Sequence, residues 1–517
     1  MAYTLLILPF HILGAGPAGI SAVHTLTLLL GTLDTNANIS ITLFEKKTRV
    51  GGRMALSLNN VLQESGVQGK ILAEDVASGN IWAGNPIVAK LASGESFLQS
   101  KQVEGDGEVH IVRTNVRTGF FDGKNVIMSL PRPVEGINWK ESLSLLFRYG
   151  LSVSRAKALP VGTMRKFRRM IGSGSVSASG WHNESVESWV RNAGLLGELE
   201  LSARERLNKN GVGGEFTHDV VEGAIKRQWG QSIDEISDLA LSAGLEREFS
   251  SSQTDEGQRL SDVLETVLRR SLNSGNVTAR LENEVLDLQR VIGEDEKEEW
   301  LISVQTADGR STSESFDQVI LAGPWNTTSL LTYEERTDLD PVPYLPQWVT
   351  FVTSDGNLDE TYFGSSNSAN LPDEIVPIPS AALPDEFATI NSLVHLRQLF
   401  LPSAPASTSA SNDSSIQQIS NLYRITSSER LNPLNISRLF TTGFTNWKEE
   451  EIPHAYPMLF PRRNGEGLGN VKVKDGLWHT GVSEAVMSSV DWSWVVGEKT
   501  ALRVWEDVQR RMRQEKK

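Results

Sequence analysis

Three glycines near the start of the chain are spaced for binding a dinucleotide phosphate. Gly14, Gly16 and Gly19 form the pattern Gly-x-Gly-x-x-Gly. In such a turn the first glycine permits a tight bend, the second lets the backbone approach a pyrophosphate, and the third lets helix and strand pack closely. The N–H groups and positive dipole of the following helix would then hold the negative charge. The pattern predicts a dinucleotide-binding turn.

A carboxylate and a second glycine pair follow this turn. Glu45 ends the second apolar run, where its side chain can accept hydrogen bonds from ribose hydroxyls. Gly51 and Gly52 again permit close backbone approach, and Arg53 can neutralise a phosphate through forked hydrogen bonds. The alternative is that Arg49 and Arg53 are surface cations on a loop.

These residues need a strand–helix–strand unit to position them. Residues 10–13 fit a buried parallel strand, residues 20–30 have helical apolar spacing, and residues 39–44 form a second strand pattern that ends at Glu45. A βαβ unit of this kind predicts an α/β fold with a parallel sheet and helices on its faces.

The remaining chain suggests that a second region is inserted into the nucleotide domain. Residues 139–272 are helical in pattern, residues 277–322 return to strands, and the acidic run 293–299 fits a hairpin tip. Gly481 precedes a final helix from Val490, in which Asp491 is expected to be a cap. We therefore expect a nucleotide domain from residues 1–85, 275–330 and 465–517, an α+β substrate region from 86–274 and 331–464, and a disordered loop at 403–415.

Composition excludes several classes of function. The net charge is −14 and the pI about 5.2, which argues against a nucleic-acid partner and against electrostatic docking to anionic membranes. The chain has no cysteine, so disulfides and thiolate chemistry are excluded. We expect no metal site, no transmembrane segment and no signal peptide, since the apolar start runs straight into the first strand.

The second glycine motif resembles that of the amine-oxidase-like flavoproteins. An acidic strand end followed by Arg49-x-Gly51-Gly52-Arg53 is similar to their second fingerprint and implies FAD as the cofactor. Residues 316–324 and 476–481 resemble late segments of the same class. The latter implies that Gly481 and the final helix N-terminus lie beside the flavin ring.

Further motifs resemble the prenylcysteine oxidase (prenylcysteine lyase) family along nearly the whole chain. They lie, in order, at residues 74–79, 147–152, 227–232, 347–350, 362–364 and 455–457, with Trp447 just before the last. The resemblance implies FAD-dependent oxidation of a prenylcysteine thioether to cysteine, a prenyl aldehyde and hydrogen peroxide, with molecular oxygen as acceptor. It also implies a lysosomal, vacuolar or secretory location, with which the glycosylation sequons at Asn276, Asn326 and Asn435 agree. The lack of a convincing signal peptide leaves a cytoplasmic location open as the alternative.

Two segments depart from the family pattern. Glu256-Gly257-Gln258 replaces a Gly-Gly-Asn segment, and residues 81–85 lack the family's histidine. These differences leave open a different prenylated or lipophilic substrate.

Candidates for chemistry and for the substrate channel are few. Glu74, His454 and His479 could each activate a water molecule, and each could equally be structural. Trp229, Trp447 and Tyr456 could line an apolar channel or simply pack in the core.

Two other functions remain open. A related flavin oxidase could act on an amine, with Trp447 and Tyr456 as an aromatic cage. A protein of another class could use a related fold to escort prenylated proteins without chemistry. The sequence does not decide the oligomeric state.

Overall fold

The computed structural model describes residues 7–31, 38–54, 117–130, 139–172, 185–249, 260–293, 297–324, 329–331, 342–364, 371–379, 382–385, 387–401 and 418–515. Glu74, Asn326 and the loop 403–415 lie outside these residues, as do the segments 74–79, 81–85 and 256–258. The predictions made for them stay predictions.

A six-stranded sheet forms the centre of the nucleotide domain. Its order is β15 (Lys472–Lys474), β16 (Leu477–His479), β9 (Gln318–Leu321), β1 (Ile7–Leu13), β2 (Asn38–Phe44) and β5 (Val277–Arg280). The strands pair in parallel, apart from the edge strand β15. The predicted βαβ unit is therefore confirmed. Both chain ends contribute strands to this sheet, and the exact domain boundaries stay a prediction.

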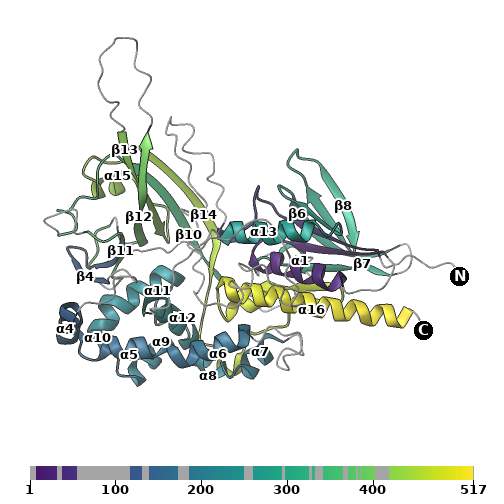
Figure 1. The fold of residues 1–517 in the computed structure, drawn as a ribbon, viewed down its shortest axis with the longest axis horizontal. Helices are drawn as coiled ribbons and strands as arrows, with labels where there is room; N and C mark the ends of the chain where they lie inside the picture. The colour runs from purple at the N-terminus through teal and green to yellow at the C-terminus, as the bar shows by residue number, and fades with distance from the viewer. Residues whose placement is uncertain are drawn as a thin grey trace, which may run out of the picture.

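Different layers cover the two faces of this sheet (Figure 1). Phe10 and Ile12 point to a core shared with α1 (Pro17–Leu30), α13 (Leu260–Leu272) and α16 (Val490–Glu515). Leu13 points to the opposite core, under a meander of β6 (Glu284–Ile292), β7 (Glu298–Gln305) and β8 (Ser311–Phe316). The acidic run does join β6 to β7, and the final helix does begin at Val490.

A seven-stranded sheet forms the second body of the fold. Its order is β14 (Asn446–Pro457), β10 (Tyr344–Ser354), β13 (Gln418–Ser427), β12 (Ile390–Leu401), β11 (Glu374–Pro377), β3 (Thr118–Phe121) and β4 (Val126–Leu130). The neighbours are antiparallel except for β11 and β3.

Helices pack below this sheet and confirm the helical pattern predicted for residues 139–272 (Figure 1). They are α4 (Trp139–Tyr149), α5 (Ser152–Ala158), α6 (Pro160–Gly172), α7 (Val186–Asn192), α8 (Leu196–Glu200), α9 (Ala203–Lys209), α10 (Gly214–Phe216), the π-helix η2 (Thr217–Val221), α11 (Glu222–Trp229) and α12 (Asp238–Phe249). Gly223 allows the close contact of α11 with β11, because a Cβ there would lie 3.1 Å from the carbonyl oxygen of Pro377.

Short helices complete the structure. They are η1 (Gly52–Met54), α15 (Pro433–Ile436), η5 (Ser437–Leu439), η6 (Arg463–Gly465) and η7 (Thr480–Ala485). No helix in the described part of the chain is both long and apolar enough to cross a bilayer.

Candidate dinucleotide site

The first glycine turn joins the end of β1 to the start of α1. Gly14 has a φ of +102°, and a Cβ there would lie 3.0 Å from the carbonyl oxygen of Ala322. A Cβ on Gly19 would lie 1.9 Å from the carbonyl oxygen of Gly14, so a side chain would push α1 off the turn. Among the described residues, no side chain caps α1 at Gly16, and the first helical turn has no acidic residue. The helix N-terminus is therefore suited to an anion.

The second glycine pair folds back onto this turn. Gly51 donates its backbone N–H to the carbonyl oxygen of Ala15 at 2.9 Å. Gly52 has a φ of +61°, and a Cβ there would lie 3.1 Å from the Cα of Gly16. The two glycine motifs thus form a single structure, which we call the glycine cradle (Gly14–Gly19 with Gly51 and Gly52).

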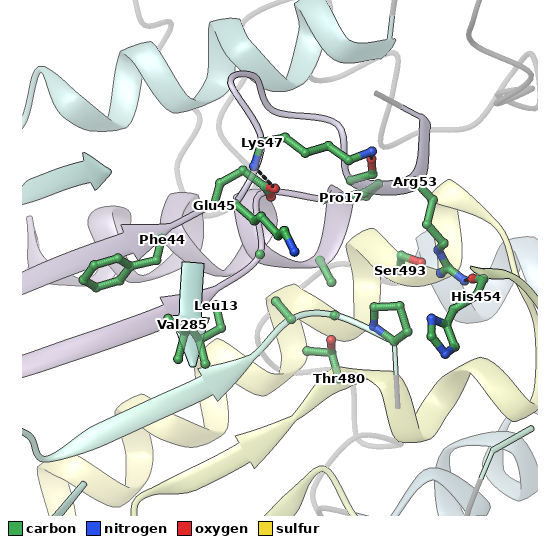
Figure 2. A pocket seen from close by; sticks show the side chains of 18 of the residues that line it. Leu13, Pro17, Phe44, Glu45, Lys47, Arg53, Val285, His454, Thr480 and Ser493 are labelled. Atoms are coloured by element: carbon green, nitrogen blue, oxygen red, sulfur yellow. Dashed lines mark hydrogen bonds between the residues drawn. The ribbon is translucent and has the colours of Figure 1, made fainter. Parts of the chain in front are cut away.

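Glu45 stands at the end of β2, beside the glycine cradle (Figure 2). Its buried carboxylate accepts the backbone N–H of Ala15 at 2.8 Å and that of Lys47 at 2.9 Å. These two donors fix the carboxylate, and its remaining lone pairs can still accept ribose hydroxyls. Burial lowers the pKa of the neighbouring Lys47 amine.

A cavity of about 540 Å³ lies between the glycine cradle and β14 (Figure 2). Its volume is in the range of ordinary ligand pockets. Its lining includes Gly14, Gly16, Glu45, Gly52, Arg53, His454, Thr480, Ser483 and Glu484. Exposed glycine backbone, a helix N-terminus and a fixed carboxylate are the groups that a pyrophosphate and a ribose require. The residues present therefore fit FAD.

Arg53 lies in the cavity wall with its charge paired. Its Nη2 donates to Glu484 Oε1 at 2.6 Å, and its Nη1 donates to the carbonyl oxygen of His454 at 3.1 Å. Tyr344 donates its hydroxyl to the other oxygen of Glu484 at 2.8 Å. Binding of a phosphate by Arg53 stays a prediction, because it would require the guanidinium to share its donors with Glu484.

The two described histidine candidates have different environments. His454 lines the cavity, and its ring meets that of Tyr344 edge-on at a centroid distance of 5.5 Å. Burial and the Arg53 cation lower the pKa of His454, which keeps the imidazole neutral at pH 7. His479 is fully buried, its Nδ1 accepts the backbone N–H of Gly481 at 2.9 Å, and burial lowers its pKa to about 3. His479 therefore caps η7, and neither it nor Gly481 is among the described residues that line the cavity.

The prediction that Asp491 caps the final helix is wrong. Because α16 begins at Val490, Asp491 lies inside the first turn, and the Oγ of Ser489 accepts the N–H of Trp492 at 3.2 Å instead. The Asp491 carboxyl is buried, and neither oxygen has a hydrogen-bond partner in the described part of the chain. Burial raises its pKa to about 7.

Two of the three aromatic candidates lie close together. Trp229 is buried and donates its indole N–H to the carbonyl oxygen of Ala240 at 3.1 Å. Tyr456 is half-buried near it, since a Cβ on Gly230, the residue after Trp229, would lie 2.8 Å from the Tyr456 ring. The Tyr456 hydroxyl accepts a hydrogen bond from Gln347 at 2.5 Å. Both side chains are thus held by partners within the protein.

Trp447 lies near the opposite end of β14. It packs against Phe444 at a centroid distance of 5.4 Å, in a separate hydrophobic cluster. At about 3.3 Å per residue, Trp447 and Tyr456 are roughly 25–30 Å apart along the strand. These two residues do not form an aromatic cage.

Sequence reasoning missed Glu484, which lines the cavity, and Tyr344, whose hydroxyl donates a hydrogen bond to Glu484. Glu484 follows the Gly481 corner in a segment without a recognisable pattern, and Tyr344 begins a strand in the middle of the chain. Only the position of β10 beside η7 brings their side chains together.

Comparison with known proteins identifies the family. Residues 135–516 match the family model for prenylcysteine lyase, and residues 12–68 match that for an NAD(P)-binding Rossmann-like domain. No match was found among curated proteins.

Solved structures share the fold. Putrescine oxidase bound to putrescine aligns at a TM-score of 0.50 with 12% identity, over 97% of this chain and 99% of the other. A triple mutant of putrescine oxidase aligns equally well, at a TM-score of 0.50 with 12% identity, over 97% of this chain and 99% of the other. An oxidoreductase from Methanosarcina mazei aligns at 0.44 with 14% identity, over 96% and 100% of the two chains. The likeness to putrescine oxidase confirms the predicted α/β fold class. Because the lyase model matches residues 135–516, well over half of the sequence, this chain belongs to the prenylcysteine lyase family.

Proposed function

We propose that the protein is an FAD-dependent oxidase that cleaves the thioether of farnesyl- or geranylgeranylcysteine. The products would be cysteine, the prenyl aldehyde and hydrogen peroxide, with water and molecular oxygen consumed. The observation that supports this most is the glycine cradle beside Glu45, in a chain of the prenylcysteine lyase family. The glycine-to-glycine approach is of little use to a protein that binds no dinucleotide.

Each part of the cradle has a role in holding the cofactor. The N-terminus of α1 and the backbone of Gly14–Gly19 would bind the pyrophosphate, and Glu45 would bind the ribose. Gly52 would let the second loop close against the same phosphate, because its lack of a side chain leaves the backbone exposed. When bound, FAD supplies the acceptor for the hydride that leaves the substrate carbon.

His454 is the described candidate best placed to handle a proton. It lines the cavity, and its lowered pKa keeps the ring neutral and able to accept a proton from water at pH 7. His479 is fully buried, uses its Nδ1 to cap η7, and is not among the described residues that line the cavity. A role for Glu74 remains a separate proposal.

The competing functions receive less support. An amine oxidase with a cage of Trp447 and Tyr456 is disfavoured, because these residues lie near opposite ends of β14, roughly 25–30 Å apart along the strand. A non-catalytic escort protein would have no need of the close approach between Gly16 and Gly52. Another prenylated or lipophilic substrate of the same chemistry is the alternative that the differences at residues 81–85 and 256–258 leave open.

A visible absorption spectrum, repeated anaerobically with farnesylcysteine and with putrescine, tests the proposal. We expect a flavin spectrum that bleaches with farnesylcysteine alone and recovers in air with formation of peroxide. A yellow protein that bleaches with putrescine only would replace the substrate with an amine. A protein that neither contains nor takes up FAD would support the escort function instead.

We also propose a lysosomal, vacuolar or secretory location. Asn276 is exposed at the start of β5, where a glycan would meet solvent. A mobility shift after peptide N-glycosidase treatment, smaller in Asn276→Gln than in the unmodified protein, is the expected result in the native host. An unshifted protein would contradict secretory passage with glycosylation at this site.

A further inference from the structure

The segment from α4 to the start of α6 exposes an unusual number of apolar side chains. Five of the nine large apolar side chains that are exposed in the described residues lie between positions 143 and 161. They are Leu143 (43% exposed), Leu146 (49%), Phe147 (82%), Leu151 (56%) and Val161 (47%). Patches of this kind on a soluble chain mark sites of interaction. We call the surface formed by α4, α5 and α6 the α4–α6 face; α5 and α6 run along the lower margin of the molecule in Figure 1.

The exposed apolar residues follow the helix geometry. Leu143, Leu146 and Phe147 are spaced i, i+3 and i+4, so they form one stripe on α4. Tyr149 lies on the other side of α4, where it is buried against Phe216. The stripe is therefore additional to the side of α4 that packs into the core.

The α4–α6 face is strongly basic in an acidic protein. Residues 139–172 contain eight basic residues and one acidic residue, a net charge of +7 in a chain of net charge −14. The basic residues are Lys140, Arg148, Arg155, Lys157, Arg165, Lys166, Arg168 and Arg169, and the acidic one is Glu141. Carboxylates beyond a Debye length of about 8–10 Å are screened, so a surface that touches this face meets its cations and only the carboxylates close to them.

Part of this charge is already paired. Arg148 binds Asp219 at 2.9 Å, Lys166 binds Glu198 at 2.6 Å, and Arg168 binds Glu246. Lys157, Arg165 and Arg169 are exposed and make no ion pair with a carboxylate of the described residues. These three cations are therefore the ones most able to bind an external anion.

We propose that the α4–α6 face docks the protein on an anionic lipid bilayer. Phe147 and its apolar neighbours would enter the boundary between headgroups and acyl chains, and the cations beside them would bind the anionic headgroups. A second copy of the chain fits this face less well, because the exposed cations of Lys157, Arg165 and Arg169 in the two copies would repel each other. The proposal does not depend on the substrate or on FAD.

Vesicle flotation of the full-length protein tests the docking. The vesicles consist of phosphatidylcholine alone or of phosphatidylcholine with phosphatidylserine, at low and high salt. We expect binding to the anionic vesicles only, weakened by high salt. Phe147→Ser/Leu151→Ser and Arg165→Glu/Arg169→Glu should each reduce it by about tenfold or more.

Matched controls separate this face from general stickiness. Leu434→Ser removes a side chain that is 78% exposed on α15, and Arg513→Glu reverses an exposed charge near the end of α16. Both controls should bind the vesicles like the unmodified protein. Circular dichroism of each variant verifies that the fold is retained.

Three results would overturn the proposal. The first is no binding to anionic vesicles, and the second is equal binding by the Phe147→Ser/Leu151→Ser variant and the Leu434→Ser control. The third is a dimer in sedimentation equilibrium that Phe147→Ser/Leu151→Ser dissociates, which would assign the face to a second copy of the chain.

Discussion

The most informative single substitution is Gly52→Ala in the glycine cradle. At its φ of +61° an alanine costs about 1–2 kcal/mol relative to glycine. The new Cβ would also lie 3.1 Å from the Cα of Gly16, which is closer than ordinary van der Waals contact. The second loop must therefore move away from the first turn by a few tenths of an ångström.

Gly443→Ala supplies the matched control. Gly443 has a φ of +72°, and no heavy atom lies within 4 Å of where its Cβ would be. The two variants share the conformational cost, so their difference isolates the effect of opening the cradle. We expect Gly52→Ala to weaken FAD binding by about tenfold or more, which corresponds to at least about 1.4 kcal/mol. Gly443→Ala should leave FAD affinity unchanged.

The assay is a titration of each apoprotein with FAD, followed by quenching of flavin fluorescence, together with thermal unfolding of the apo forms. The two variants should lose similar thermal stability, while only Gly52→Ala loses affinity. A wild-type dissociation constant for Gly52→Ala would refute the reasoning, since the close approach of the loops would then have no role in binding the cofactor.

Three further predictions concern titratable groups. Glu484→Gln should lower the free energy of unfolding by about 1–3 kcal/mol by removing the charge that pairs with Arg53; an unchanged urea midpoint would contradict this. Asp491→Asn should stabilise the fold more at pH 8 than at pH 5. Burial raises the pKa of the Asp491 carboxyl from 3.8 to about 7, so its contribution to stability is complete below pH 3.8 and is lost as the pH rises through 7. Urea unfolding at both pH values measures the effect of the substitution, and an equal effect at the two pH values would count against the prediction. His454→Gln should retain FAD but slow substrate-dependent bleaching by about 100-fold or more; stopped-flow absorbance measures the rate, and an unchanged rate would remove His454 from the mechanism.

The amino-acid sequence by itself determined the dinucleotide turn and its setting. Gly14 and Gly52 adopt positive φ values, and Gly19 has no room for a Cβ. Because these positions favour glycine, the glycines in the sequence indicate the backbone conformation of the turn. Glu45 was found for a similar reason, because a carboxylate at the end of the second strand must lie beside the turn. Periodicity likewise located the helices and strands that build the two sheets, since apolar spacing follows from which side is buried.

The tertiary structure alone decided which side chains meet. Arg53 and Glu484 are 431 positions apart, and only the packing of η7 against η1 and β10 pairs them. His454 and His479 look equivalent in sequence, but one lines a cavity and the other caps a helix.

Whole-chain averages also conceal what the fold exposes. The net charge of −14 predicts repulsion from anionic membranes, yet residues 139–172 carry a net charge of +7 beside an exposed Phe147. Charge acts over about a Debye length and apolar side chains act by direct contact, so recognition depends on the local surface. Which residues form that surface is settled by the packing of the helices and not by their composition.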